Sequence, residues 1–326
     1  MTTQPAVTVC VPTFRRTGFL PGLVAALEAQ VGAPPFEVVI VDNGSGDGTW
    51  AALGELVRRT PLALAALRLD TNLGPGPARN RAASHGRAPL LAFTDDDCLP
   101  APGWVAALVR AVMDPAVAVV QGCTRPPPGP APGTWARSVW VNGPTAWFET
   151  CNIAYRRAAF ARAGGFDEAD TVSSRHGGGR PFGEDAWLGA RVVATGGRHV
   201  FAPQAVVHHR WIAGGFRDHL AERRHMRGFP GLVRRVPGLA GSTWGGVFLS
   251  RRTAAFDAAL ACTVAAVALR RPALAAGALP WFAAAWGPAR ARRGRLPLRL
   301  AQAAVADLAG LSALVEGSVR YRRLVL

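Results

Sequence analysis

The first 121 residues of the chain alternate between short apolar runs and stretches with helical spacing, joined by short polar links. The apolar runs have the length and the valine and leucine content of buried strands, whereas the other stretches repeat apolar residues three and four positions apart. Strands are predicted at residues 7–11, 36–41, 66–69, 89–94 and 116–121, and helices at residues 20–29, 49–58, 78–84 and 102–112. This alternation predicts a parallel, Rossmann-like α/β sheet.

Three consecutive aspartates, Asp95, Asp96 and Asp97, directly follow one of these apolar runs. Carboxylates crowded at the end of a strand repel one another, and a bound divalent cation relieves that repulsion. Mg²⁺ and Mn²⁺ prefer oxygen ligands, and Mg²⁺ commonly joins one or two carboxylates to substrate phosphates. The triplet therefore indicates a metal–diphosphate site. It is equally compatible with a solvated acidic turn in which Asp97 caps a helix that begins near Pro102.

Polar residues also follow the first two predicted strands. Ligands of open α/β sheets bind at the carboxyl ends of the strands, and Thr13, Arg15 and Asp42 fall there together with the aspartate triplet. Residues 42–45 are also ordinary turn formers, so Asp42 alone decides nothing. The glycine-rich stretch at 73–79 matches neither the GxGxxG nor the P-loop pattern, and a dinucleotide or ATP loop is not indicated.

Strands and helices continue between residues 147 and 209. The predicted strands cover residues 147–155 and 199–207, and the predicted helices cover residues 156–163 and 184–194. The first of these strands contains Glu149, and the second runs into His208 and His209, which either supply an imidazole to a metal or simply pack. Residues 169–181 contain three consecutive glycines and predict a mobile loop, a candidate lid over a site.

Glu184 and Asp185 follow Gly183 at the predicted start of a helix. The helix dipole favours acidic residues in the first turn, which is one explanation of the pair. The other is catalytic: a carboxylate at the mouth of the site acts as a general base, and the glycine before it lets the substrate approach. The sequence leaves both explanations open.

The net charge of +16 comes from 37 arginines, with no lysine in the chain. Residues 1–218 hold 20 arginines and 17 acidic residues, whereas residues 219–326 hold 17 arginines and four acidic residues. The basic excess of the last third favours anionic partners: nucleotide phosphates, an anionic membrane surface or nucleic acid. The five cysteines lack CxxC spacing and the N-terminus lacks a signal-peptide pattern, which predicts reduced thiols in a cytoplasmic protein.

We predict two parts of the chain: a catalytic domain at residues 1–228 and a basic, mostly helical region at residues 229–326. Alanine-rich apolar runs at 253–269 and 272–286 are shorter than the ~20 residues that span a bilayer, and arginines flank both. A hairpin lying in or against an anionic cytoplasmic leaflet is therefore predicted. The alternatives are a spanning segment and an ordinary helical subdomain packed on the sheet. Residues 296–314 continue with helical spacing.

Seven segments, in this order, resemble the motifs of a family 2 glycosyltransferase of the GT-A fold, which implies a mixed, mostly parallel α/β sheet flanked by helices. They are VPTFRR at 11–16, VDNGS at 41–45, GPARNRA at 76–82, FTDDD at 93–97, CNIAYRR at 151–157, GGFDE at 164–168 and GEDAWLGAR at 183–191. The resemblance implies transfer of a sugar, with inversion, from a nucleoside-diphosphate donor to a saccharide or lipid-linked acceptor, assisted by Mn²⁺ or Mg²⁺. The family's QxxRW element is not evident, and residues 223–228 occupy its region, which points away from processive polymerases.

The resemblance also implies roles for single residues. The donor is implied to contact Pro12, Thr13, Arg15, Asp42, Asn43, Arg79, Asp95 and Asp96, with Asp42 at the base. The metal is implied to bind Asp97, together with Asp95 and either His208 or His209. Asp185, beside Glu184, is implied to be the catalytic base.

Elementary chemistry agrees with these roles. Breaking a glycosyl–phosphate bond builds negative charge on the leaving diphosphate, which a metal ion stabilises. The acceptor hydroxyl is a poor nucleophile near neutral pH, and a positioned base contributes about 10²–10⁴-fold. Three alternatives stay open: a double displacement with Glu149 as nucleophile, a nucleotidyltransferase of similar fold, and a non-catalytic basic protein that binds membranes or nucleic acid. Nucleic acid is not the expected partner, because the tail lacks a nucleic-acid reading motif.

Overall fold

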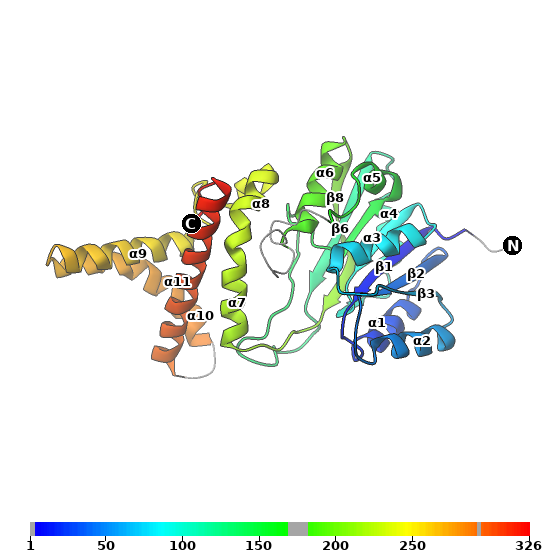
Figure 1. Cartoon of the computed structure of the whole chain (residues 1–326), viewed down its shortest axis with the longest axis horizontal. Helices are drawn as coiled ribbons and strands as arrows, with labels where there is room; N and C mark the ends of the chain where they lie inside the picture. The colour runs from blue at the N-terminus through cyan, green and yellow to red at the C-terminus, as the bar shows by residue number, and fades with distance from the viewer. Residues whose placement is uncertain (1–3, 169–181, 292–294) are drawn as a thin grey trace. The chain divides into compact units, whose positions relative to one another are not determined.

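The computed structural model describes residues 4–168, 182–291 and 295–326, and the predicted lid at 169–181 lies outside them. The chain forms two compact units (Figure 1). The first, here called the sheet unit, contains Met1–Pro130 and Ser138–Trp211. The second, the helical unit, contains Ala131–Arg137 and Ile212–Leu326. The domain division predicted after residue 228 stays a prediction.

An eight-stranded sheet forms the centre of the sheet unit, with strand order β3-β2-β1-β4-β7-β6-β8-β5. The strands are β1 (Val7–Thr13), β2 (Phe36–Asp42), β3 (Ala63–Arg68), β4 (Leu90–Thr94), β5 (Cys98–Pro100), β6 (Val117–Arg125), β7 (Asn152–Arg156) and β8 (Arg198–His209). Four pairs of neighbouring strands are parallel: β1 with β2, β1 with β4, β2 with β3, and β6 with β8. β7 is antiparallel to β4 and β6, and β5 to β8. The prediction of a mixed, mostly parallel sheet is confirmed.

Helices cover both faces of this sheet, as Figure 1 shows. They are α1 (Leu20–Glu28), α2 (Thr49–Arg59), α3 (Pro75–His85), α4 (Trp104–Ala111), α5 (Arg157–Arg162) and α6 (Glu184–Ala194). Alternate residues of a strand point to opposite faces: Val38 and Ile40 pack with the core under α1, α2 and α4, and Val39 packs with the core under α3, α5 and α6. Each fully buried Val or Leu contributes roughly 1.5–3 kcal/mol, so continuous apolar strands hold both layers.

Two elements of the sheet unit differ from the sequence prediction. The strand predicted at 147–155 begins only at Asn152, because Phe148 has a positive φ of 51° and the Asn152 amide closes a turn onto the Glu149 carbonyl at 3.3 Å. Glu149 therefore lies in a turn. The short strand β5 was not predicted; it follows a turn in which the Cys98 amide donates to the Asp95 carbonyl at 3.1 Å.

The helical unit is built from five α-helices, apart from residues 292–294, which the structure does not describe. They are α7 (Phe216–His225), α8 (Phe229–Arg235), α9 (Arg251–Ala268), α10 (Leu279–Ala291) and α11 (Leu296–Tyr321), with short 3₁₀ segments η2 (Met226–Gly228), η3 (Pro237–Ser242) and η4 (Pro272–Ala278). Phe256, Trp281 and Ala303 lie in a small core shared by α9, α10 and α11. The alanine-rich run at 272–286 is divided into η4 and α10, and α7 and α8 were not predicted as separate helices.

Candidate active site

The aspartate triplet lies in the loop between β4 and β5, and each carboxylate accepts a hydrogen bond, with Arg16 shared between Asp96 and Asp97. Arg79 Nη2 donates to Asp95 Oδ1 at 2.8 Å, Thr13 Oγ1 donates to Asp96 Oδ2 at 2.6 Å, and Arg16 donates to Asp97 Oδ2. The repulsion expected from the sequence is thus relieved by one hydroxyl and two guanidinium groups. Arg16 was not among the predicted site residues, although it follows Arg15 directly.

Asp96 ties the triplet to the end of β1. Its side chain is buried, and burial raises the pKa of Asp96 to about 7, although the Thr13 hydrogen bond and the Arg16 charge lower it. A carboxyl group enclosed in this way, bonded to the last residue of β1, fixes the loop that carries its neighbours. These surroundings give Asp96 a structural role, and its predicted contact with the donor stays a prediction.

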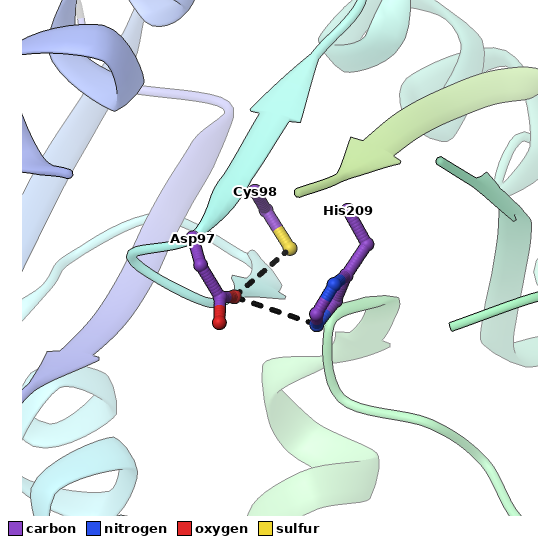
Figure 2. A group of neighbouring side chains, drawn as sticks. All are labelled: Asp97, Cys98 and His209. Atoms are coloured by element: carbon purple, nitrogen blue, oxygen red, sulfur yellow. Dashed lines mark hydrogen bonds and ion pairs between the residues drawn. The ribbon is translucent and has the colours of Figure 1, made fainter. Parts of the chain in front are cut away.

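A second group joins Asp97 to the end of β8, as Figure 2 shows. β5 pairs with β8 so that Cys98 lies opposite His209, and this register brings His209 Nε2 to 3.5 Å from Asp97 Oδ1. Cys98 Sγ lies 3.9 Å from the same oxygen, and all three side chains are buried. Burial raises the pKa of the Cys98 thiol, which therefore stays protonated and donates weakly to Asp97.

The two histidines at the end of β8 are not equivalent. His209 Nδ1 lies 2.9 Å from the carbonyl oxygen of Arg210, which can only accept, so Nδ1 carries a proton. In the neutral ring, Nε2 carries a lone pair that faces Asp97 Oδ1, and two lone pairs repel each other. A proton or a cation shared by Nε2 and Asp97 Oδ1 would make the contact favourable. His208 Nδ1 lies instead 3.2 Å from the Pro126 carbonyl. His209 therefore takes the place of His208 as the candidate metal ligand.

Arg79, on α3, connects the triplet to α6. Its guanidinium lies 2.8 Å from Asp95, 3.7 Å from Glu184 and 3.6 Å from Asp185, and the residue is only 5% exposed. Burial disfavours its charge, but the three carboxylates together raise the pKa of Arg79 above its ordinary value. The acidic residues at 95 and at 184–185 thus meet at one arginine.

Asp185 is oriented by Thr150, whose amide and hydroxyl both donate to Asp185 Oδ2, at 3.1 and 2.9 Å. Its other oxygen, Oδ1, is buried without a hydrogen bond. Burial raises the pKa of Asp185 above its ordinary value, although Arg79 and Thr150 favour the charged form. Burial and the adjacent Asp185 carboxylate raise the pKa of Glu184 to about 7. This helix therefore begins with two carboxyl groups that hold protons more tightly than exposed acids do.

A pocket of about 300 Å³ opens beside these two carboxyl groups. It is lined by Trp147, Glu149, Gly183, Glu184 and Asp185. Glu149 Oε2 accepts from Gln121 Nε2 at 2.6 Å and from Thr145 Oγ1 at 2.7 Å, and burial raises its pKa. The loop that carries Trp147 and Glu149 is anchored by Phe148: a Cβ at Gly189 of α6 would lie 2.1 Å from the Phe148 ring.

The remaining predicted donor residues lie at the ends of β1 and β2. Thr13 pairs with Asp42 across these strands, and Pro12 pairs with Val41. Asp42 Oδ1 accepts from the Ser45 amide at 3.0 Å, and Ser45 Oγ accepts from the Arg15 amide at 2.8 Å.

Asn43 binds loop atoms instead: its amide group bonds Asn72, Leu73 and Gly74. Strand pairing and the Thr13–Asp96 bond thus bring Asp42 and the triplet to one edge of the sheet, while Asn43 holds the next loop in place.

Residues 8–172 match the family model described as Glycosyl transferase family 2, which is just over half of the chain, and the protein therefore belongs to that family. It is 31% identical over 229 residues to a validoxylamine A glucosyltransferase of Streptomyces hygroscopicus subsp. limoneus, which covers 59% of this chain and 49% of the relative. It is 30% identical over 233 residues to the O-antigen biosynthesis protein RfbC of Myxococcus xanthus, covering 63% of this chain and 17% of that protein. The match thus spans about half of the first relative's length, and less of the second's.

Solved structures give the same fold. The mannosyltransferase PcManGT from Pyrobaculum calidifontis, in complex with GDP-Man and Mn²⁺, superposes with a TM-score of 0.59 at 22% identity, covering 98% of this chain and 88% of that chain. TarS 1-349 of S. aureus, in complex with UDP-GlcNAc, gives a TM-score of 0.51 at 17% identity, covering 97% and 92%. These likenesses confirm the predicted GT-A fold.

Proposed function

We propose that the protein transfers a glycosyl group from a nucleotide-sugar donor to an acceptor hydroxyl, with inversion at the sugar carbon. One observation carries the proposal: Arg79 holds Asp95, at the end of β4, close to Glu184 and Asp185, at the start of α6. A transfer of this kind needs a place for a diphosphate and a base close to it. The family match and the nucleotide sugars in the complexes of PcManGT and TarS support the same donor class.

Asp185 is the proposed general base. Its carboxylate borders the pocket beside Glu149, where the acceptor would enter, and Thr150 fixes the orientation of the carboxylate. A base works best when its pKa lies near the operating pH, and burial moves the pKa of Asp185 in that direction. Asp185 would take the proton of the acceptor hydroxyl as the oxygen attacks the sugar carbon from the side opposite the leaving diphosphate. Glu184 would accompany it as the second carboxyl group of the site.

Asp97 and His209 are the proposed ligands of a divalent metal ion, and Asp95, two residues before Asp97, is the proposed third ligand. His209 Nε2 lies 3.5 Å from Asp97 Oδ1, and a cation bound by both atoms would make this contact favourable. Carboxylate oxygens are the ligands that suit Mn²⁺ and Mg²⁺. The Mn²⁺ in the PcManGT complex supports this choice. A bound metal would neutralise charge on the leaving diphosphate. Thr13, Arg15 and Asp42, with Pro12 and Asn43 behind them, would form the nucleotide side of the site, and Arg79 would keep Asp95 in position.

A double displacement is the second candidate mechanism, because Glu149 lines the same pocket as Asp185. In that case Glu149 would attack the sugar first, and the product would retain the configuration of the donor. The two hydrogen bonds to Glu149 Oε2 favour a positioning role over attack, since they tie up the nucleophilic oxygen. The configuration of the product, read by NMR of the anomeric proton, separates the two mechanisms.

The acceptor is proposed to be a saccharide or a lipid-linked saccharide, and the protein is proposed to act in the cytoplasm, at the inner face of a membrane. The names of the two relatives, a glucosyltransferase and an O-antigen biosynthesis protein, support a saccharide-like acceptor. Reduced cysteines, all five of them without a disulfide, agree with a reducing compartment.

The test is the release of nucleoside diphosphate by purified protein from a panel of nucleotide sugars, with and without Mn²⁺ or Mg²⁺. Asp185→Asn is expected to lower turnover by about 10²–10⁴-fold while donor binding, measured by calorimetry, stays close to that of the wild type. Asp97→Asn is expected to weaken the response to metal. Asp114→Asn, an exposed acid away from the site, is the matched control. Full turnover in Asp185→Asn would overturn the assignment of the base, and no release from any donor would overturn the activity.

A further inference from the structure

The helices α9, α10 and α11 of the helical unit are apolar on their outer sides as well as on the sides that face the core. On α9, Leu260, Val264 and Val267 recur at helical spacing and are exposed, with Val267 76% exposed. On α10 the same holds for Leu279, Phe282 and Trp286. Soluble proteins expose single apolar residues routinely, but a repeated apolar stripe on an outer face marks an interaction surface.

On α11 the two faces can be compared directly. Ala303, Gly310 and Gly317 follow the buried side of this helix at a spacing of seven residues. Five large apolar residues are exposed on the helix, namely Leu298, Val305, Leu308, Val315 and Val319. At 100° per residue these five fall within one third of the circumference, opposite the buried side. A helix that is apolar on both faces has one face for its own core and one for another apolar medium.

Charge identifies that medium. Arginines stand at the ends of these helices, with Arg270 and Arg271 after α9 and Arg322 and Arg323 after α11, and all four are exposed. Of the four acidic residues in 219–326, Asp307 is buried against Arg252 and Trp281, and the whole segment carries 17 arginines. The outer surface therefore combines valine, leucine and aromatic side chains with a large positive excess.

We propose that this surface, the outer side of α9, α10 and α11, docks on an anionic lipid bilayer, with the helices in the plane of the interface. An apolar stripe flanked by arginines is the chemistry of a helix that inserts between headgroups and pairs with anionic lipids. A second copy of the chain would match the apolar stripe but would oppose one basic surface with another. Nucleic acid would match the charge but would leave the aliphatic side chains without a partner.

The buried charges of the helical unit argue for docking in the plane. Among the described helices, only α11 is long and apolar enough to cross a membrane, with a mean hydropathy of 1.4 in its best window. Its centre carries Asp307, bonded to Arg252 of α9 at 2.8 Å and to the Trp281 indole at 2.9 Å. A spanning α11 would bring this ion pair to the middle of the hydrocarbon, where charged groups are costly. In the interface the pair stays inside the small helical core.

The test is co-sedimentation of the full chain with vesicles of phosphatidylcholine alone or of phosphatidylcholine with 30 mol% phosphatidylglycerol. The wild type is expected to bind the anionic vesicles, with weaker binding to the neutral ones, and to be released by a wash in high salt. Val267→Glu, Phe282→Glu and Val319→Glu, combined, are expected to lower the binding at least tenfold. A second variant replaces four arginines with glutamine, at Arg270, Arg271, Arg322 and Arg323. Its binding to the anionic vesicles is expected to fall about fivefold for each arginine replaced.

Met113→Glu is the control for each of the three glutamate substitutions taken singly, because Met113 is 73% exposed on the sheet unit and the change adds one negative charge, as each of them does. Circular dichroism shows whether each variant is folded. The proposal is overturned if the wild type does not sediment with anionic vesicles, or if the combined apolar variant binds as the wild type does. It is also overturned if the protein stays with the vesicles after a wash in alkaline carbonate, as a membrane-spanning protein does. A dimer in light scattering that the combined apolar variant dissociates would overturn it as well. Nucleoside diphosphate release, assayed without vesicles, reports separately on the proposed transfer.

Discussion

In the sheet unit one described arginine, Arg79, is buried among carboxylates, whereas the described arginines of the helical unit are exposed or half-buried. Arg79 is 5% exposed and lies within 4 Å of three carboxylates, and Arg16 contacts Asp97. The helical unit has one comparable buried pair, Arg252 with Asp307, among its described residues, and its other charges gather at helix ends. The same residue type therefore organises a polar site in one unit and a basic surface in the other. Composition alone does not distinguish these uses; the placement of the acids does.

The largest effect is expected at Arg79. Arg79→Met removes the cation from three neighbouring carboxylates, and breaking a buried ion pair costs about 3–5 kcal/mol. The free energy of unfolding, measured with urea at pH 7.5, is expected to fall by that amount, and less at pH 5, where the carboxyl groups take up protons. Arg79→Lys, which keeps the charge, is the control. Equal stability of the wild type and Arg79→Met would mean that the sheet unit does not depend on its internal charges.

A smaller loss of unfolding free energy is expected when the buried ion pair of the helical unit is broken. Asp307→Asn keeps the shape of the side chain and the contact with the Trp281 indole, but removes the charge that faces Arg252. Because Arg252 reaches solvent, with 29% of its side chain exposed, the expected loss in unfolding free energy is about 1–3 kcal/mol. Calorimetry of the full chain measures it. A loss as large as that of Arg79→Met would erase the contrast between the units.

The pH dependence of stability tests the burial of Glu184. Its pKa of about 7 in the folded protein lies above the ordinary value of 4.5, so the folded state binds the proton more tightly than the unfolded chain. The stability of the wild type is therefore expected to fall as pH rises between these two values. Glu184→Gln cannot ionise, so its unfolding free energy relative to the wild type should be higher at pH 8 than at pH 5. A difference that does not change with pH would show that Glu184 is not held in its neutral form.

The smallest effect is a shift in a rate profile. Thr150→Val removes a hydrogen bond that favours the charged form of Asp185, so the pKa of Asp185 rises. The acid limb of kcat/KM against pH is expected to move to higher pH, with the rate recovered at high pH. Thr145→Val is the matched control, because Thr145 bonds Glu149 in the same pocket. A shift in the control and none in Thr150→Val would transfer the role of base to Glu149.

Much of the sheet unit follows from the sequence because its strands are continuous apolar runs and its helices repeat apolar residues at helical spacing. Asp42 and Asp95 could be assigned to one edge of the sheet, since parallel strands end together. The choice between His208 and His209 could not be made, because it depends on the register of β5 against β8, and the three residues of β5 carry no periodic signal. Arg16 and Thr150 were missed for a related reason: their contacts come from chain segments distant in sequence.

The helices α7 and α8 escaped prediction because their composition is mixed. None of the residues of α7 is buried, and seven residues of α8 are too few to show a period. The alanine-rich runs in the tail agree with the helical region predicted there, but they gave no indication of which side of each helix faces a core. That information comes from packing: a tryptophan, Trp281, is buried at the centre while Phe282, the next residue, is 45% exposed.

The contact between Phe148 and Gly189 limits which positions of this pocket can change. The Phe148 ring occupies the space that any side chain at position 189 would need, and Phe148 itself adopts a left-handed backbone. The contact between Phe148 and Gly189 thus fixes α6, which carries Asp185, relative to the turn that carries Glu149 and Thr150. A substitution of Trp147 or Glu149 would change the lining of the pocket on this frame, whereas a side chain at Gly189 would displace Phe148 and with it both the start of α6 and the pocket wall.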